Sequence, residues 1–320
     1  MDNHNVLVRR HDEHLDRMPL TIISTLAPFS ALIMSIVFVV YFCIRFYVLE
    51  GFLLKRIYGA TYTTMDETVR RGFVNHHIAG GTKILILIAA VYPFISVVFG
   101  TANFHTRFAG TTSPVTMGDI LIVVSQMLIA MYIFELFYRP KISPVSVGHH
   151  VGTIMIGQSA IAISLDLVRE PDADIEFSLC LVWGAFDIIA EFLPHVTIIL
   201  YRVYPSSHAF LRRLFLAAMA TTLTGTIAET TLTMYMFGSL WDRWTLAFKV
   251  TTPMLHVLFA AAQLWGSWNF YCLYQRECRF LAAGRHHNID ALEEAKPAGD
   301  HPSDASNMWS ADEPQTAHVG

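Results

Sequence analysis

The chain has 320 residues, of which 53% are hydrophobic and only 15% are charged, and its mean hydropathy is +0.43. Soluble globular proteins carry roughly a quarter charged residues, so this composition is typical of a membrane protein. The net charge is −4 and the sequence has no dense basic cluster with interleaved aromatic residues, which excludes a nucleic-acid-binding protein.

The apolar stretches predict the membrane topology. A polar N-terminal segment is followed by an apolar run that is too long for the core of a signal peptide, so we interpret this run as a membrane anchor that stays attached. A spanning helix needs about 20 mostly apolar residues. We therefore predict an all-α polytopic membrane protein with about seven transmembrane helices in a bundle around a central cavity. The predicted spans are 25–49, 83–100, 118–138, 148–168, 176–201, 213–238 and 246–273.

The same pattern divides the chain into four parts. The polar segment 1–24 precedes the first span and its connecting segment, 25–69, in which we expect a short interfacial helix near Met65–Arg71. Residues 70–275 form the main membrane domain. Residues 276–320 are mostly polar or small and cannot bury a core, so we expect a cytosolic tail that is disordered beyond about residue 290.

The distribution of Lys and Arg predicts the orientation in the membrane, because cytosolic flanks carry an excess of both. With seven spans, the two sides differ by a factor of two. The N-terminal side has seven of these residues: Arg9, Arg10, Arg17, Arg107, Arg169, Arg243 and Lys249. The opposite side has fourteen: Lys55, Arg56, Arg70, Arg71, Lys83, Arg139, Lys141, Arg202, Arg212, Arg213, Arg276, Arg279, Arg285 and Lys296. We therefore expect a lumenal or exterior N-terminus and a cytosolic C-terminus.

Ionisable side chains inside the predicted spans are the main functional signal, because each costs about 2.5–3.5 kcal/mol on the lenient insertion scale. His149 and His150 open the fourth span, and Thr153 shares the face of His149 one turn later. In the fifth span, Asp187, Glu191 and His195 follow one another at intervals of four residues, so they form one polar stripe along the helix. A further carboxylate, Glu135, lies at the end of the third span.

These residues form a polar cavity open to the cytosol if their helix faces converge. Asp187 lies near mid-membrane and has no basic neighbour one turn away, so it is the hardest to explain as a purely structural residue. Glu135 has a simpler explanation, an i, i+4 pair with Arg139, and His195 could cap a helix end. For the lone His256 a structural role is the favoured interpretation.

The motif F-Y-R-P-K-I-S-P-V-S-V-G-H-H-V-G-T, followed by a span, a loop and D-I-I-A-E, resembles the TLC-domain family. This family includes ceramide synthases and translocation-associated membrane proteins, and the match covers roughly residues 70–275. The resemblance implies N-acylation of a sphingoid base by acyl-CoA. It implies that His149 or His150 is the general base or acyl acceptor, and that Asp187 orients a histidine or holds the amine.

The resemblance also implies the surroundings of this chemistry. Acyl-CoA is the expected co-substrate, no bound cofactor is expected, and the partners are membrane lipids such as a sphingoid base or another acyl lipid. Residence in the endoplasmic reticulum and a homo-oligomeric assembly are compatible with it. Glu135, Thr153, Glu191 and His195 are the expected residues of the substrate cavity.

One departure from the family pattern leaves the chemistry open. Ceramide synthases carry roughly H-D-x-x-D where this chain reads W-G-A-F-D, so Trp183 and Gly184 replace a His-Asp pair. An altered lipid acyltransferase and a non-enzymatic lipid-binding, lipid-transfer or membrane-homeostasis protein are therefore both retained. A metal-dependent lipid enzyme is less favoured, because the repeated histidine boxes of membrane hydroxylases are missing, and we expect no metal ligands.

Overall fold

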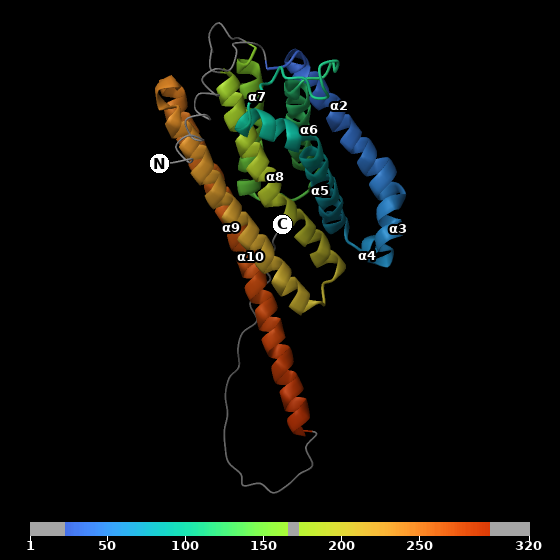
Figure 1. The fold of residues 1–320 in the computed structure, drawn as a ribbon. Helices are drawn as coiled ribbons and strands as arrows, with labels where there is room; N and C mark the ends of the chain where they lie inside the picture. The colour runs from blue at the N-terminus through green and yellow to red at the C-terminus, as the bar shows by residue number, and fades with distance from the viewer. Residues whose placement is uncertain (1–22, 166–172, 295–320) are drawn as a thin grey trace.

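A computed structural model describes residues 23–165 and 173–294 (Figure 1). Within these ranges the chain is helical and has no β-strand, which confirms the all-α prediction. The first helical unit comprises a 3₁₀ turn (η1), α2, a π-helix (η2) and α3: Ala27–Phe29, Ser30–Cys43, Ile44–Leu53 and Leu54–Tyr58. The following elements are α4 Ala60–Thr63, α5 Glu67–Phe94 with η3 Ile95–Phe99, α6 Met117–Tyr138, α7 Pro144–Ile163, α8 Ala173–Val203, α9 His208–Ser239, η4 Trp241–Arg243 and α10 Leu246–Glu294.

Four of the described helices are long and apolar enough to cross a membrane, against the seven spans that we predicted. They are Ala27–Tyr58, Glu67–Phe99, Met117–Tyr138 and Ala173–Val203. The stretches predicted as the remaining spans fall in α7, α9 and α10, which are long helices of lower hydropathy. The histidine pair and Gln158 lower the mean hydropathy of α7, and a series of threonines lowers that of α9.

The second span begins earlier than its hydropathy indicated. We expected a polar connection up to residue 82, with an interfacial helix near Met65–Arg71, but α5 starts at Glu67 and continues into η3. Asp66 caps this helix by accepting hydrogen bonds from the backbone amides of residues 68 and 69. The prediction was wrong because polar side chains in the first half of α5, such as Asn75, are buried against other helices and not exposed to water.

The C-terminal boundary also differs from the prediction. Helix α10 continues to Glu294, so the first part of the segment 276–320 is helical and does not form a tail. Its last part, 295–320, lies outside the described residues, as do 1–22 and the end of the predicted fourth span at 166–172.

Six of the long helices form a closed ring. Going round it, α6 packs on α5, α5 on α8, α8 on α9, α9 on α10, α10 on α7, and α7 again on α6. The first helical unit lies outside the ring against α6, and α10 extends beyond the other helices (Figure 1). Close approach of α8 and α9 requires a glycine, since a Cβ on Gly225 would lie 2.7 Å from Cβ of Ala190.

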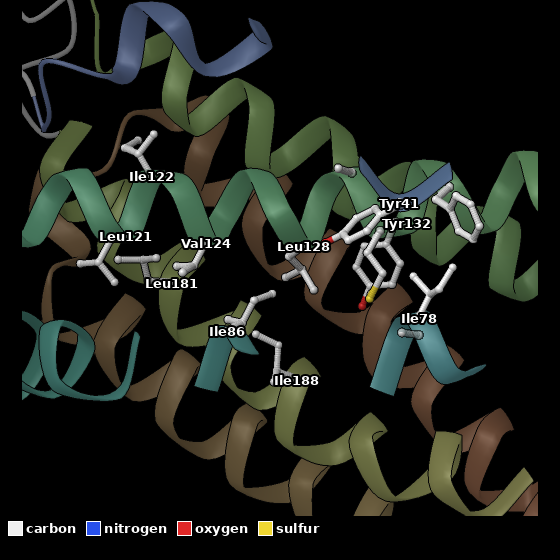
Figure 2. Close-up of a cluster of buried hydrophobic side chains, with 14 of the residues drawn as sticks. Tyr41, Ile78, Ile86, Leu121, Ile122, Val124, Leu128, Tyr132, Leu181 and Ile188 are labelled. Carbon is white, nitrogen blue, oxygen red and sulfur yellow. The ribbon is translucent and has the colours of Figure 1, made fainter. Parts of the chain in front are cut away.

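The interior of the ring is apolar along most of its length. Leu121, Val124 and Leu128 project from α6 towards Ile86 of α5 and Ile188 of α8 (Figure 2). Tyr132 follows one turn after Leu128 and marks the point on α6 at which the interior becomes polar. The sequence of α6 therefore places an apolar chamber and a polar end on one continuous helix face.

Replacing Gly225 by Ala is expected to destabilise the bundle by about 1–3 kcal/mol, because the added methyl group would overlap Ala190 on a neighbouring backbone. The measurement is thermal unfolding of the purified protein in detergent. Gly266→Ala in α10 is the matched control: no described atom lies within 4 Å of its Cβ position, so helix propensity alone should stabilise it slightly. Equal melting temperatures for the two variants would contradict the close α8–α9 contact.

Candidate functional site

A cavity of about 580 Å³ lies inside the ring, and all six ring helices contribute to its wall. Its volume is within the range of small-molecule sites, roughly 300–1,000 Å³. Most of the wall is aliphatic or aromatic. Apart from Ser125 of α6, whose hydroxyl donates to the backbone of its own helix, the polar side chains in the wall form two groups: His149, Thr153, Trp183 and Asp187 on α7 and α8, and Glu229 and Gln263 on α9 and α10.

The first of these groups is built on a contact between α7 and α8. His149 Nε2 lies 3.2 Å from Asp187 Oδ1, and both side chains are buried, with 9% and 6% of their surface exposed. The Tyr132 hydroxyl of α6 donates a hydrogen bond to the other oxygen of Asp187. The ring of Phe259 from α10 packs edge-on against the imidazole. The predicted partnership of His149 with the stripe on the fifth span is thus present in the structure.

A lysine that the predicted topology counts among the cations at the cytosolic boundary of the second span completes this cluster. Lys83 has no exposed surface, and its Nζ donates to Glu191 Oε2 over 2.7 Å and to the backbone oxygen of Asp187 over 3.4 Å. His149 Nε2 lies 3.6 Å from Glu191 Oε1. Because Asp187 and Glu191 are one turn apart on α8, a single cation from α5 reaches both. Lys83 must therefore be removed from the flanking charges used for the orientation, which leaves thirteen against seven.

The second histidine of the pair has different neighbours. His150 Nε2 lies 3.4 Å from Glu135 Oε2, and its ring stacks on Tyr132 with centroids 4.4 Å apart. Arg139 Nη1 donates to Glu135 Oε1 over 2.5 Å, so the simple i, i+4 pair is also present. Neither His150 nor Glu135 is part of the cavity wall, although Tyr132 connects them to the cluster around Asp187.

His195 and Glu191 were expected to line the cavity, and the structure places both beside it but outside its wall. His195 Nδ1 lies 2.9 Å from Nδ1 of His76, so one of the two nitrogens donates to the other. The pair His76-His77 carried no functional signal in the sequence, because a helix partner 119 positions away cannot be read from local spacing. Thr153 does line the cavity, but its hydroxyl donates to the backbone oxygen of His149.

Trp183 and Gly184, the residues that depart from the synthase pattern, both line the cavity. The indole of Trp183 donates to His256 Nδ1 over 3.0 Å and lies parallel to its ring. Since indole is only a donor, His256 must carry its proton on Nε2, which faces the hydroxyl of Thr230 at 3.0 Å. Both nitrogens of His256 are therefore satisfied, in line with the structural role predicted for this residue.

The charges of the cluster suit a group that accepts a proton. Lys83 contributes +1, Asp187 and Glu191 contribute −1 each, and the cluster with a neutral His149 carries −1 in total. Taking up one proton makes it neutral, which is favourable in a low-dielectric interior. While Nε2 of His149 faces the carboxylates, its Nδ1 is buried and has no hydrogen-bond partner among the described residues. In the neutral imidazole this nitrogen carries the free lone pair, so it is the one that takes up the proton.

A metal ion is chemically conceivable at the same place. His149, Asp187 and Glu191 each have a ligand atom within 4.8 Å of the others. The oxygens that face His149 Nε2 are Asp187 Oδ1 and Glu191 Oε1, because the Tyr132 hydroxyl and the Lys83 ammonium occupy the other two carboxylate oxygens. Lys83 already neutralises one of the two carboxylates, so the donor set fits a protein ion cluster better than a metal centre.

The chain matches no family model, no curated protein and no solved structure. The function is therefore inferred from the cavity, the cluster and the motif resemblance.

Replacing Lys83 by Met is expected to destabilise the protein by about 3–5 kcal/mol, because it leaves buried carboxylates without their cation. The double variant Lys83→Met/Glu191→Gln removes one charge of each sign and should recover a large part of this loss. Unfolding measurements on the two single variants and the double variant give the coupling energy. Additive effects would show that the ion pair does not act as a unit.

Proposed function

We propose that this chain is an integral membrane protein that binds a lipid acyl chain in the central cavity and transfers an acyl group at its polar end. The observation that carries the proposal is the His149–Asp187 pair, which lies in the largely apolar wall of a cavity formed by six helices. In this proposal the seven long helices all span the membrane. The chain would be a member of the TLC-domain family, as its motif suggests.

The apolar wall supports the lipid part of the proposal. A chain of methylene groups gains roughly 0.8 kcal/mol for each one transferred from water to an apolar site, but nothing comparable from lipid. A lipid that moves from the bilayer into such a cavity is therefore stabilised by the fit of its chain to the wall and by polar contacts at one end of the cavity. The cavity has both, because Leu128 and Ile188 shape its wall while His149 and Asp187 supply the polar groups.

The proposed reaction is attack of a lipid amine or hydroxyl on the thioester of acyl-CoA. A bond forms between the nucleophile and the acyl carbon, the carbon–sulfur bond breaks, and coenzyme A leaves as a thiol. His149 Nδ1 would take the proton of the nucleophile and return it to the leaving sulfur. Asp187 would hold the ring by accepting from Nε2, and Tyr132 and Lys83 would fix the two carboxylates. A sphingoid base is the acceptor that the family resemblance suggests.

A non-catalytic lipid-binding or lipid-transfer protein is the second candidate, and one observation favours it. Trp183 occupies the position of a synthase histidine and is engaged with His256, while Gly184 leaves no acidic group beside it. The cavity would then hold a lipid without reacting with it. In either case the charge distribution supports a cytosolic C-terminus, and the resemblance supports residence in the endoplasmic reticulum.

The adjacent histidines provide an internally matched test of the acyltransferase proposal. His149→Ala is expected to lower the rate of acyl transfer by about 10²–10⁴-fold, because it removes the base. His150→Ala should lower it much less, since His150 lies outside the cavity wall. The assay uses purified protein with a panel of acyl-CoAs and long-chain amines and alcohols.

The acyltransferase proposal fails if the wild-type protein shows no transfer with any pair in the panel, or if His149→Ala keeps the full rate. Retention of a co-purified lipid by both histidine variants in that case would support the lipid-binding alternative. Metal analysis of the same preparations tests the metal reading, which predicts one equivalent of a divalent ion that disappears in His149→Ala.

Replacing Gly184 by Phe tests the cavity independently of the chemistry. A Cβ at this position lies 3.6 Å from Leu128 Cδ2, so Ala fits while a phenyl ring must enter the cavity. We expect Gly184→Phe to reduce co-purified lipid, measured by mass spectrometry, and Gly184→Ala to leave it unchanged. Equal lipid content in the two variants would place the lipid elsewhere.

A further inference from the structure

A second polar group lies at the same end of the bundle, where the C-terminal end of α6 meets the first helical unit and the start of α5. Its centre is Tyr138, which is 2% exposed and stacks on Phe134. The Tyr138 hydroxyl donates to Glu50 Oε1 over 2.5 Å. The guanidinium groups of Arg45 and Arg71 lie 4.6 Å and 5.0 Å from the centre of the Tyr138 ring.

The π-helix η2 is what brings Arg45 and Glu50 together. In an α-helix, residues five apart differ by about 140° around the axis and cannot pair, because each residue turns about 100°. A π-helix makes i→i+5 hydrogen bonds, so residues five apart lie above one another. Arg45 Nη2 and Glu50 Oε2 are accordingly 3.0 Å apart. Such π segments are rare and are frequent at functional sites.

Arg71 lacks the partner that the other arginines of this group have. Arg45 pairs with Glu50, and Arg139, next to Tyr138, pairs with Glu135. No carboxylate among the described residues forms an ion pair with Arg71, and its Nε is buried without a hydrogen-bond acceptor. A buried guanidinium N–H that has no acceptor costs about 1–3 kcal/mol or more, so a ligand that supplies one would be stabilised there.

The charge balance of the group indicates the sign of that ligand. Around Tyr138, the guanidinium groups of Arg45 and Arg71 lie beside a single carboxylate, that of Glu50, which leaves one positive charge in excess. Planar guanidinium groups recognise phosphate with paired hydrogen bonds, and anionic lipid headgroups attract arginines at the membrane boundary.

We propose that Arg71, with Arg45 and Tyr138 beside it, forms a binding site for a phosphate group at the cytosolic end of the bundle. The phosphate belongs either to the headgroup of an anionic membrane lipid or to free phosphate. This site is separate from the cavity and does not rest on acyl transfer: an inactive acyltransferase could still bind phosphate here, and the reverse also holds.

The test titrates the purified full chain, in detergent, with dioleoyl phosphatidic acid, with dioleoyl phosphatidylcholine and with inorganic phosphate. Bound lipid is counted by native mass spectrometry and stabilisation is followed by thermal unfolding. We expect phosphatidic acid to bind and to raise the melting temperature of the wild-type protein more than phosphatidylcholine does. Equal stabilisation by inorganic phosphate would identify free phosphate as the ligand, and no response to it would identify the lipid headgroup.

Arg71→Gln is expected to weaken phosphatidic acid binding at least about tenfold, which is 1.4 kcal/mol. Arg56→Gln, an exposed arginine on α3 at the same end, is the matched control for loss of one charge and should bind as the wild type does. Arg71→Lys keeps the positive charge but loses the paired hydrogen bonds of the guanidinium group, so its affinity for phosphatidic acid should be intermediate. It replaces Arg71→Gln in the test if that variant does not fold. Equal weakening by Arg56→Gln and Arg71→Gln, or no preference of the wild type for phosphatidic acid, would overturn the site.

Discussion

The ion cluster around Lys83 is the interaction on which the arrangement of the ring depends. A fully buried ammonium group at 2.7 Å from Glu191 holds α5 against α8, and His149 and Tyr132 extend the same cluster to α7 and α6. Each charge is tolerable inside a membrane bundle only in the presence of the others. Four helices must therefore pack in one register, or several charged groups are left without partners.

This constraint explains why the cavity has one polar end. The cluster occupies one part of the interior, and much of the remaining wall is formed by apolar residues such as Leu121 and Leu128. In the proposed function, a ligand with an apolar chain would place its polar group against His149 and Asp187. Orientation of this kind is a requirement for acyl transfer and is equally useful to a protein that only carries lipid.

The sequence predicted those features whose signals are local. Helical spacing identified the stripe of Asp187 and Glu191, and it also identified the pair of Glu135 with Arg139. Length and composition predicted an all-α chain. These inferences need only the geometry of one helix, or the sum of hydropathies along it.

The partners supplied by other helices could not be predicted. Lys83 looked like a flanking cation because the residues before it are polar, and only the packing of α5 on α8 shows that it lies in the interior. Tyr132 and His76 carry no charge at neutral pH that would mark them in a sequence. One indirect signal existed. Asp187 is predicted to lie mid-membrane and has no basic neighbour on its own helix, so it requires a cation from another helix, and Lys83 is the lysine at the start of an apolar run.

The π-helix at Ile44–Leu53 has a consequence for the length of the first helical unit. Each residue of an α-helix rotates the chain by about 100°, so the segment is sensitive to single-residue changes in a way that a regular helix end is not. Deleting one residue between Arg45 and Glu50 would return the segment to α-helical geometry with the two residues four apart on one face, so they could still pair while the helix before them stays in place. The segment thus fixes the angular position of α3 relative to α2, and it does so through chain length as much as through side-chain identity.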